Sequence, residues 1–286
     1  MLPATCVGSR SKRAGRPAVR AATFARRPAA PPPRQNTPMN LPWLHAGEPF
    51  PDVSTAWDET QPAPGLLAAG GALDVDSLHR AYSAGIFPWF SQGQPILWWS
   101  TDPRMVLFTG EFKLHRSLRK TLQKFVADPR CEVRIDSAFT DVIRGCAGSE
   151  RPGQSGTWIV PRMVKAYEAF HRAGHAHSVE TWIDGRLEGG LYCVGVGRAV
   201  FGESMFTRVP DGSKIALAAL VAWCRAHGIG LIDCQQNTSH LASLGAREIP
   251  RADFVAQVAR NTRQPAPPWR FEPVYWNLLL PPKTTA

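Results

Sequence analysis

Three strand-like segments separated by two short turns constrain the fold of this chain more than any other feature. The segments cover residues 178–183, 186–196 and 199–206, and the turns between them are Asp184-Gly185 and Gly197-Arg198. Glycine at such positions supplies the backbone freedom that a tight hairpin turn requires. The pattern therefore predicts a three-stranded antiparallel meander, in a chain of 286 residues with 44% hydrophobic content that can bury a large core.

Helices are predicted before and after the meander in the sequence. A long helix from about residue 213 to 227 ends at Gly228, and LIDCQ at 231–235 is a further strand. One-sided apolar spacing predicts additional helices at 76–84, 113–126, 137–146, 161–176, 239–246 and 251–260. Helices, then a meander, then a strand–helix–strand unit predict an α+β or α/β fold with a mixed sheet.

Composition suggests how the chain is divided. Residues 41–110 are dense in turn residues and aromatics and predict a small mixed N-terminal domain, followed by a larger domain at 111–270 and a C-terminal tail at 271–286. Residues 1–40 contain seven Arg, one Lys and no acidic residue, which accounts for most of the formal charge of +10. Such an Arg-, Ala- and Pro-rich segment is expected to be disordered. It is interpreted as a targeting segment, a basic arm, or an upstream start with Met39 as the true first residue; the last is favoured.

Several classes of protein are disfavoured. No apolar run reaches the length of a membrane span, so no membrane association is expected. The six cysteines show neither C-x-x-C nor metal spacing, which predicts reduced thiols in the cytoplasm and no metal site.

Polar residues on otherwise apolar strands mark the candidate site. Glu203 lies in the third meander strand, and Asp233 and Gln235 lie in LIDCQ. Because strand side chains alternate, Asp233 and Gln235 are expected on one face about 7 Å apart, and Glu203 and Met205 are expected to share a face as well. Buried polar groups need partners or a task, so these residues are candidates for chemistry. The alternative is that they cap the next helix or satisfy backbone groups.

Ordered motifs over residues 41–254 resemble one family. They are GLLAAGG, AYSAGIFPWF, PILWWSTDPRMVL, GTWI, HAHSVETW, FGESMFTR, LIDCQ and HLASLGAREIPR. Together they are similar to the leucyl/phenylalanyl-tRNA–protein transferase family. The resemblance implies a C-terminal domain like that of acetyltransferases. It also implies transfer of Leu or Phe, less often Met, from its tRNA to proteins that begin with Arg or Lys, which marks them for degradation.

The resemblance also implies roles for individual residues. Asp233 and Gln235 become the catalytic pair, with Asp233 accepting a hydrogen bond from the incoming α-amino group; in an alternative, the terminal ribose hydroxyl of the tRNA assists instead. The aminoacyl side chain is expected in a pocket formed by Leu191, Glu203, Met205, Thr207, Leu217, Leu220 and Ile232. An aminoacyl ester is already activated, so orientation and a proton path suffice and no cofactor is expected.

Binding of tRNA is expected at two places. Trp89 and Trp158 match family tryptophans around the terminal adenosine, although core packing is the more common role for any one of the ten Trp residues. The predicted helix at 113–126 has a basic face, formed by Lys113, Arg116, Arg119, Lys120 and Lys124, that could contact acceptor-stem phosphates, although such a face can also be merely solvated. The expected partners are therefore Leu-tRNA, Phe-tRNA and proteins with N-terminal Arg or Lys, bound by a monomer.

Two other function classes remain open from the residues alone. Arg225, Gly228 and Gly230 fit the R-x-x-G-x-G spacing of an acetyl-CoA pyrophosphate loop, which would make the chain an N-acetyltransferase. That motif closes a helix here instead of opening one, which argues against an anion site. A non-enzymatic RNA-binding protein is the other class, but it leaves Glu203, Asp233 and Gln235 without a role.

Overall fold

A computed structural model describes residues 41–149 and 159–281. These described residues form one compact unit. The disordered extension predicted for residues 1–40 lies outside the described residues.

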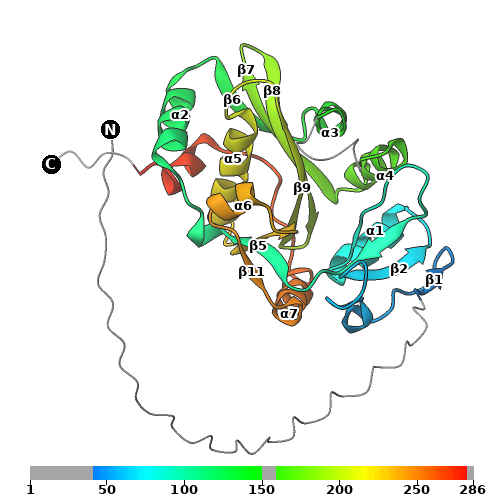
Figure 1. The fold of residues 1–286 in the computed structure, drawn as a ribbon. Helices are drawn as coiled ribbons and strands as arrows, with labels where there is room; N and C mark the ends of the chain where they lie inside the picture. Colours follow the sequence, from blue (N-terminus) through cyan, green and yellow to red (C-terminus); the bar gives the residue numbers. More distant parts are fainter. Residues whose placement is uncertain (1–40, 150–158, 282–286) are drawn as a thin grey trace, which may run out of the picture. The chain divides into compact units, whose positions relative to one another are not determined.

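A seven-stranded mixed sheet organises the molecule (Figure 1). Its strands, in spatial order, are β11 (Arg247–Ile249), β5 (Arg104–Phe108), β10 (Leu231–Gln235), β9 (Ala199–Thr207), β8 (Arg186–Val196), β7 (Ala176–Ile183) and β6 (Cys131–Ile135). Neighbouring strands run antiparallel except β9 and β10, which are parallel. The predicted meander is confirmed as β7–β8–β9, and Asp184, Gly185 and Gly197 have the positive φ that its turns require.

Helices cover both faces of this sheet. On one face, α5 (Gly212–Ala226) packs against β7, β8 and β9, and α2 (Arg116–Ala127) packs against α5 and β6. On the other face lie α1 (Val75–Ser83), α3 (Phe139–Ala147) and α4 (Pro161–Arg172), with α7 (Arg251–Asn261) contributing Phe254 and Val258 to the same core. Alternate residues of β8 divide between the two cores: Leu191 and Cys193 face α5, while Tyr192 and Val194 face α3 and α4.

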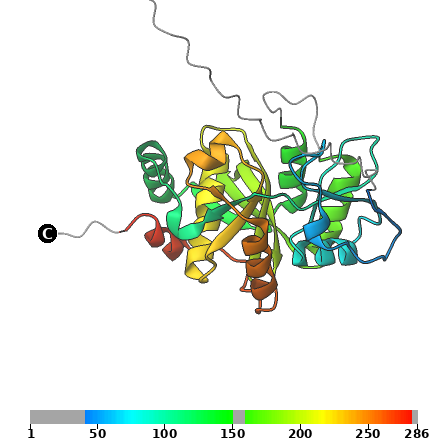
Figure 2. The same cartoon turned by 60° about the horizontal axis from the view of Figure 1, so that its bottom comes forward.

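A second, four-stranded sheet precedes the large one. It consists of β1 (Trp43–Leu44), β2 (Leu66–Gly70), β4 (Leu97–Trp99) and β3 (Phe87–Pro88), in that spatial order. Figures 1 and 2 both show these blue and cyan strands to one side of the large sheet. The mixed α/β architecture expected from the sequence is therefore confirmed. The next strand, β5, falls before residue 110 but belongs to the large sheet.

Some predicted element boundaries differ from the observed ones. Helix α2 begins at Arg116, so Lys113 precedes the helix instead of lying on it. Helix α6 (Ser239–Ser243) is shorter than predicted, because Gly245 has a φ of +100° and the chain turns into β11. The C-terminal segment packs onto the α5 core through the 3₁₀ helix Pro273–Leu278, and Trp276 is buried there. Gly228, with a φ of +67°, follows the end of α5 as predicted.

Two negative findings concern the described residues. None of their helices is both long and apolar enough to cross a bilayer. In the same ranges, no group of three or more His, Cys, Asp or Glu side chains is arranged to hold a metal ion.

Candidate active site

A fully buried ion pair joins β5 to β10, the LIDCQ strand. The guanidinium of Arg104 donates through Nε to Oδ1 of Asp233 and through Nη2 to Oδ2, both at 2.7 Å. Both residues have no solvent exposure. The rings of Phe87 and Phe254 lie on either side of the guanidinium, at 4.7 and 4.5 Å from its Cζ atom. Such a pair stabilises a buried carboxylate only with good geometry, and this bidentate arrangement supplies it.

Gln235 lies beyond an irregularity in β10. Pairing with β5 shifts register between Asp233 and Gln235, and Gln235 has a φ of +56°, in the left-handed region. Its backbone N–H donates to Oδ1 of Asp233 at 3.0 Å, and its carbonyl accepts from Thr101 Oγ1 at 3.1 Å. The predicted regular alternation therefore ends at Asp233. Backbone strain of this kind persists where surrounding contacts fix it, and Asp233 provides one of those contacts.

Glu203 is the extra residue of a second bulge. In the β8–β9 ladder Tyr192 pairs with Ser204 and Cys193 pairs with Gly202, so no residue of β8 pairs with Glu203. The bulge reverses the alternation. As a result, Glu203 points to the face of α1 and α4, whereas Met205 packs with the α5 core. The prediction that these two side chains share a face is wrong for this reason.

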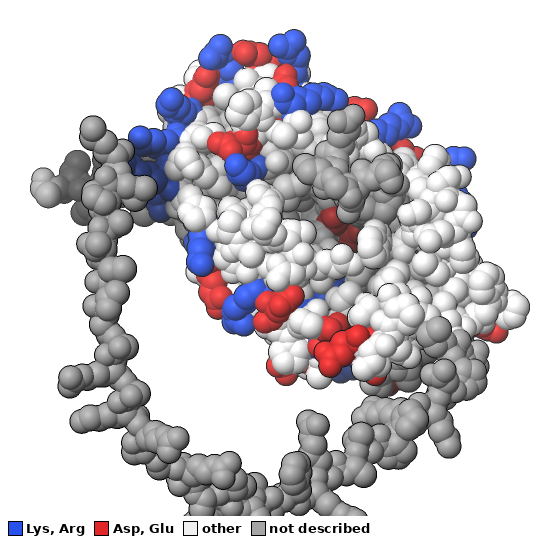
Figure 3. Space-filling model, viewed as in Figure 1, with Lys and Arg blue, Asp and Glu red and all other residues white. Residues whose placement is uncertain are grey.

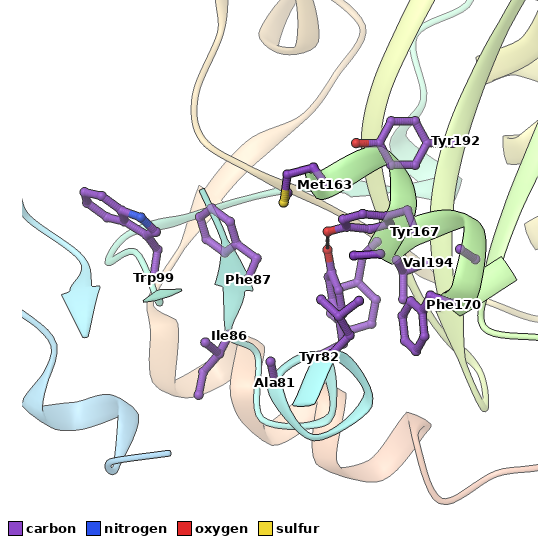
Figure 4. Packing of buried hydrophobic residues seen from close by; sticks show 14 of the residues in the cluster. Ala81, Tyr82, Ile86, Phe87, Trp99, Met163, Tyr167, Phe170, Tyr192 and Val194 are labelled. Atoms are coloured by element: carbon purple, nitrogen blue, oxygen red, sulfur yellow. Dashed lines mark hydrogen bonds between the residues drawn. The ribbon is translucent and has the colours of Figure 1, made fainter. Parts of the chain in front are cut away.

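Two buried tyrosines hold the Glu203 carboxyl. Tyr82 on α1 donates to Oε1 at 2.7 Å, and Tyr167 on α4 approaches Oε2 at 3.4 Å. The two hydroxyl groups also bond to each other, and Figure 4 shows both side chains meeting between the two helices. Burial raises the pKa of Glu203 to about 8, against the opposing effect of the Tyr82 hydrogen bond. The pKa values of both tyrosines are raised, chiefly by burial, so they remain neutral donors.

The candidate site lies where β9 and β10 separate. Pairing between the two strands joins Ile232 to Val200 and Asp233 to Phe201, while β9 continues to Thr207. Just past these pairs, the side-chain amide of Gln235 lies 3.5 Å from Oε1 of Glu203. Figure 3 shows a hollow over this part of the molecule with acidic atoms at its floor. The carboxyl ends of adjacent parallel strands are a common location for ligands in α/β folds.

Most of the residues expected in the aminoacyl pocket lie together on the α5 face. Five of them belong to that core: Leu191, Met205, Leu217, Leu220 and Ile232. Thr207 is exposed at the end of β9, and its hydroxyl donates to the carbonyl of Val209 at 2.5 Å. Glu203 lies on the opposite face. The seven expected residues therefore divide between the α5 face, the opposite face and the end of β9.

The described residues that are expected to bind tRNA belong to other elements than β9 and β10. Trp89 is half-buried, its ring meets that of Trp99 edge-on at 5.3 Å, and its carbonyl accepts from Nε1 of Trp99. Trp158 lies outside the described residues. Arg116, Arg119, Lys120 and Lys124 are exposed on α2, where Figure 3 shows Lys and Arg side chains along the margin of the molecule. Arg119 also donates to the carbonyl of Leu279 at 3.4 Å.

The candidate acetyl-CoA motif has a structural role. Arg225 donates to the carbonyl of Thr109 through Nε at 2.8 Å and Nη2 at 2.6 Å, and to the carbonyl of Leu278 at 2.9 Å. The motif closes α5 and leads into β10, so no helix N-terminus faces it. Arg225 thus joins the end of α5 to Thr109, which directly follows β5, and to the C-terminal segment.

Three residues of the site were missed by sequence reasoning. Arg104 opens an otherwise apolar strand, and a charged residue in that position is a signal for a buried partner. Tyr82 and Tyr167 lie on the apolar stripes of α1 and α4, where an aromatic residue is ordinary core. Nothing in their spacing indicated that their hydroxyl groups meet at Glu203.

Comparisons with known proteins identify the family of this chain. The family model "Leucyl/phenylalanyl-tRNA protein transferase" matches residues 106–259, and the model of its N-terminal domain matches residues 71–102. Among curated relatives with that name, one from Polaromonas sp. is 66% identical over 243 residues, covering 85% of this chain and 95% of the relative. Another, from Albidiferax ferrireducens, is 60% identical over 247 residues, covering 86% and 97%.

Similarity to solved structures is low. The structure of L-PGS from Bacillus licheniformis matches with a TM-score of 0.35 and 11% identity, over 55% of this chain and 50% of that one. A GCN5-related N-acetyltransferase from Kribbella flavida matches with a TM-score of 0.29 and 9% identity, over 57% and 56%. By contrast, the alignments with the two sequence relatives cover almost the full length of those relatives. Both relatives are named as transferases, which excludes a non-enzymatic RNA-binding protein. The chain therefore belongs to the leucyl/phenylalanyl-tRNA–protein transferase family, and it is an enzyme that transfers an aminoacyl group from tRNA to protein.

Proposed function

We propose that the enzyme transfers Leu or Phe, less often Met, from its aminoacyl-tRNA to the α-amino group of proteins that begin with Arg or Lys. The product carries a new bulky N-terminal residue, which serves as a degradation signal. One observation carries the assignment of the site: the Gln235 amide meets the Glu203 carboxyl where the parallel strands separate, beside an apolar core. An amine and an activated ester could meet there.

The aminoacyl side chain is proposed to enter from the α5 face. The residues available there, Leu191, Met205, Leu217, Leu220 and Ile232, are all apolar. Such a lining favours Leu and Phe over polar side chains, because a polar group would lose its hydrogen bonds to water without replacement. Selectivity between apolar side chains that differ by a methylene is smaller, about 1–3 kcal/mol.

Asp233 is proposed to act by positioning Gln235. Its carboxylate is held by Arg104 and accepts the backbone N–H of Gln235, which fixes the left-handed residue whose amide reaches the site. Gln235 is partly exposed and can contact a substrate. Orientation of an amine against an activated ester is itself a large source of rate enhancement.

The tRNA is proposed to lie across α2, with its terminal adenosine stacked on Trp89 and Trp158. Exposed cations on α2 suit phosphates, and they carry no base specificity, as an enzyme that accepts several tRNAs requires. Aminoacyl-tRNA acts as a co-substrate, and we propose that no cofactor is needed. We also propose that the enzyme works as a monomer in the cytoplasm, where charged tRNA is made.

A transfer assay tests this function. Labelled Leu-tRNA is incubated with a peptide that begins with Arg and, separately, with the same peptide beginning with Met. We expect label on the Arg peptide alone. Acetyl-CoA serves as a competing donor, and acetylation without aminoacyl transfer would contradict the proposal.

A further inference from the structure

The carboxylate of Asp233 is occupied by protein donors. Oδ1 accepts from Arg104 Nε and from the backbone N–H of Gln235, and Oδ2 accepts from Arg104 Nη2. These bonds use three of the roughly four acceptor positions of a carboxylate. Asp233 is also fully buried, so its carboxylate is poorly placed to contact a substrate amine.

Glu203 differs in each of these respects. It is partly exposed, and the residues around its carboxyl are neutral hydroxyl and amide donors. Oε1 accepts the close hydrogen bond from Tyr82. Within the described part of the chain, the hydrogen bond to Oε2 is the long one from Tyr167. One oxygen is thus anchored and the other is available for a proton.

We propose that Glu203 is the catalytic residue that accepts the proton of the attacking α-amino group and returns it to the departing ribose oxygen. This inference rests on the proposed function, since it assigns the proton transfers of that reaction. Gln235 orients the carboxyl and the substrate, and Tyr82 and Tyr167 are positioning residues. Asp233 and Arg104 form the support behind Gln235 and do not touch the substrate.

Glu203 alone can carry out both proton transfers of the reaction. The neutral amine of the acceptor attacks the ester carbonyl, forming the C–N bond. Glu203, ionised at the start, takes the N–H proton from the resulting adduct. The ester C–O bond then breaks, and Glu203 delivers the same proton to the oxygen that leaves with the tRNA. The residue ends ionised and ready for another cycle, with no other reactant required.

The neighbours of Glu203 determine the pKa of its carboxyl. Facing groups are Tyr82 on α1, Tyr167 on α4, Asp233 on β10 and Arg104 on β5. Burial and the charge of Asp233 favour the protonated carboxyl, while the Tyr82 hydrogen bond, Arg104 and Tyr167 oppose them, and the resulting pKa is about 8. A carboxyl whose pKa lies near neutral pH is ionised often enough to accept a proton and, once protonated, acidic enough to donate it to a leaving oxygen.

The test is the pH dependence of a rate ratio. Single-turnover transfer from Leu-tRNA to an Arg-initial peptide is measured from pH 6 to pH 9 for the wild type and for Glu203→Gln. Titration of the amine affects both proteins equally, so the ratio of their rates isolates residue 203. We expect the ratio to rise by about tenfold per pH unit at the acidic end and to level off above about pH 8, as the ionised fraction of a base does.

Two further variants keep the test decisive if Glu203→Gln folds poorly. Glu203→Asp retains a carboxylate and should transfer slowly with a pH-dependent ratio. Tyr82→Phe removes a hydrogen bond that favours ionisation, so its plateau should move to higher pH. Tyr275→Phe, in the C-terminal 3₁₀ helix, is the matched control and should leave the profile unchanged.

The outcomes separate the two proposals. A wild type without transfer would refute the proposed function itself. Transfer by the wild type together with a flat ratio, or a Glu203→Gln rate equal to that of the wild type, would overturn the role of Glu203 alone. In that case the proton would pass through the ribose hydroxyl or Asp233, and a 2′-deoxy terminal adenosine would distinguish them.

Discussion

At the scale of single residues, the site depends on two carboxyl groups with opposite environments. Asp233 has a buried cation as its partner, whereas Glu203 has neutral donors. Burial among neutral donors raises the pKa of Glu203. One sheet therefore contains a carboxylate paired with a cation and a carboxyl with a raised pKa on neighbouring strands, β10 and β9.

The Arg104–Asp233 pair should show strong coupling. Asp233→Leu and Arg104→Met each leave one buried charge without its partner, so each is expected to lower the free energy of unfolding by about 3–5 kcal/mol. The double variant removes both charges and should cost clearly less than the sum. Urea denaturation of the four proteins measures this. The exposed Arg130–Asp128 pair is the control, and Asp128→Asn there should change little. Additive costs at the buried pair would contradict the coupling.

Glu203 should make stability depend on pH. Its pKa rises from the ordinary 4.5 to about 8 on folding. Between these values the folded protein binds more protons than the unfolded chain, so the contribution of Glu203 is complete below about pH 4.5 and is lost as pH rises to about 8. Relative to Glu203→Gln, the wild type should lose roughly 3–4 kcal/mol between pH 5 and pH 8. Denaturation at several pH values tests this, and parallel curves for the two proteins would contradict it.

At the scale of elements, the bulges create the site. Strand β10 loses its regular geometry at Gln235 and strand β9 at Glu203, and these two irregularities bring the two side chains together. Bulges redirect side chains in this way and are common beside active sites. The four-residue spacing of helices and the two-residue period of strands contain no information about an inserted residue.

Substitutions of Gln235 should affect stability and transfer activity differently. Its φ of +56° costs little for Gly or Asn but more for a β-branched residue. Gln235→Gly should therefore retain stability, Gln235→Val should lose about 1–2 kcal/mol, and both should lose most transfer activity. Gln235→Asn keeps an amide on a shorter stem and should be stable and slow. Thermal denaturation and the transfer assay check these expectations, and a fully active Gln235→Gly would contradict a role for the amide.

Helix α2 should determine the salt dependence of tRNA binding. Lys120→Ala and Lys124→Ala are each expected to reduce the slope of log K against log salt by about 1, because one phosphate contact is lost. The transfer rate at saturating tRNA should stay the same, since α2 lies away from Glu203 and Gln235. Arg260→Ala on α7 is the control with an exposed cation elsewhere. Slopes that match the wild type would indicate that α2 is merely solvated.

Regular sequence patterns allowed much of the fold to be predicted, whereas contacts between distant residues could not be predicted from them. The meander and the end of α5 at Gly228 follow from local turn chemistry, and the sequence contains both signals. Strand β6 was missed although its sequence, CEVRI, alternates apolar and charged residues as an edge strand does. In the site, Glu203, Asp233 and Gln235 could be named as polar residues on apolar strands. Arg104 carried a similar signal, but its partner and those of the two tyrosines could not be named, because they lie 129, 121 and 36 residues away in the sequence.

At the scale of the whole molecule, the C-terminal segment closes the α5 core. Trp269 stacks between His177 of β7, at 3.9 Å, and Trp223 of α5, at 4.1 Å. A Cβ atom at Gly195 of β8 would lie 2.7 Å from the Trp269 ring. The strand, the helix and the last part of the chain therefore meet at one indole, and a glycine makes room for it.

This closure predicts a specific non-additivity. Trp269→Ala should lower the free energy of unfolding by an amount at the lower end of about 3–5 kcal/mol, because the ring is only partly buried. Gly195→Ala should cost about 1–3 kcal/mol by displacing the ring, yet it should cost almost nothing once Trp269 is Ala, since the colliding atoms are gone. Gly230→Ala, where an added Cβ meets nothing within 4 Å, is the control. Urea denaturation of the single and double variants measures the difference. An unchanged cost of Gly195→Ala in the Trp269→Ala background would show that Gly195 is required for the strand itself and not for the C-terminal segment.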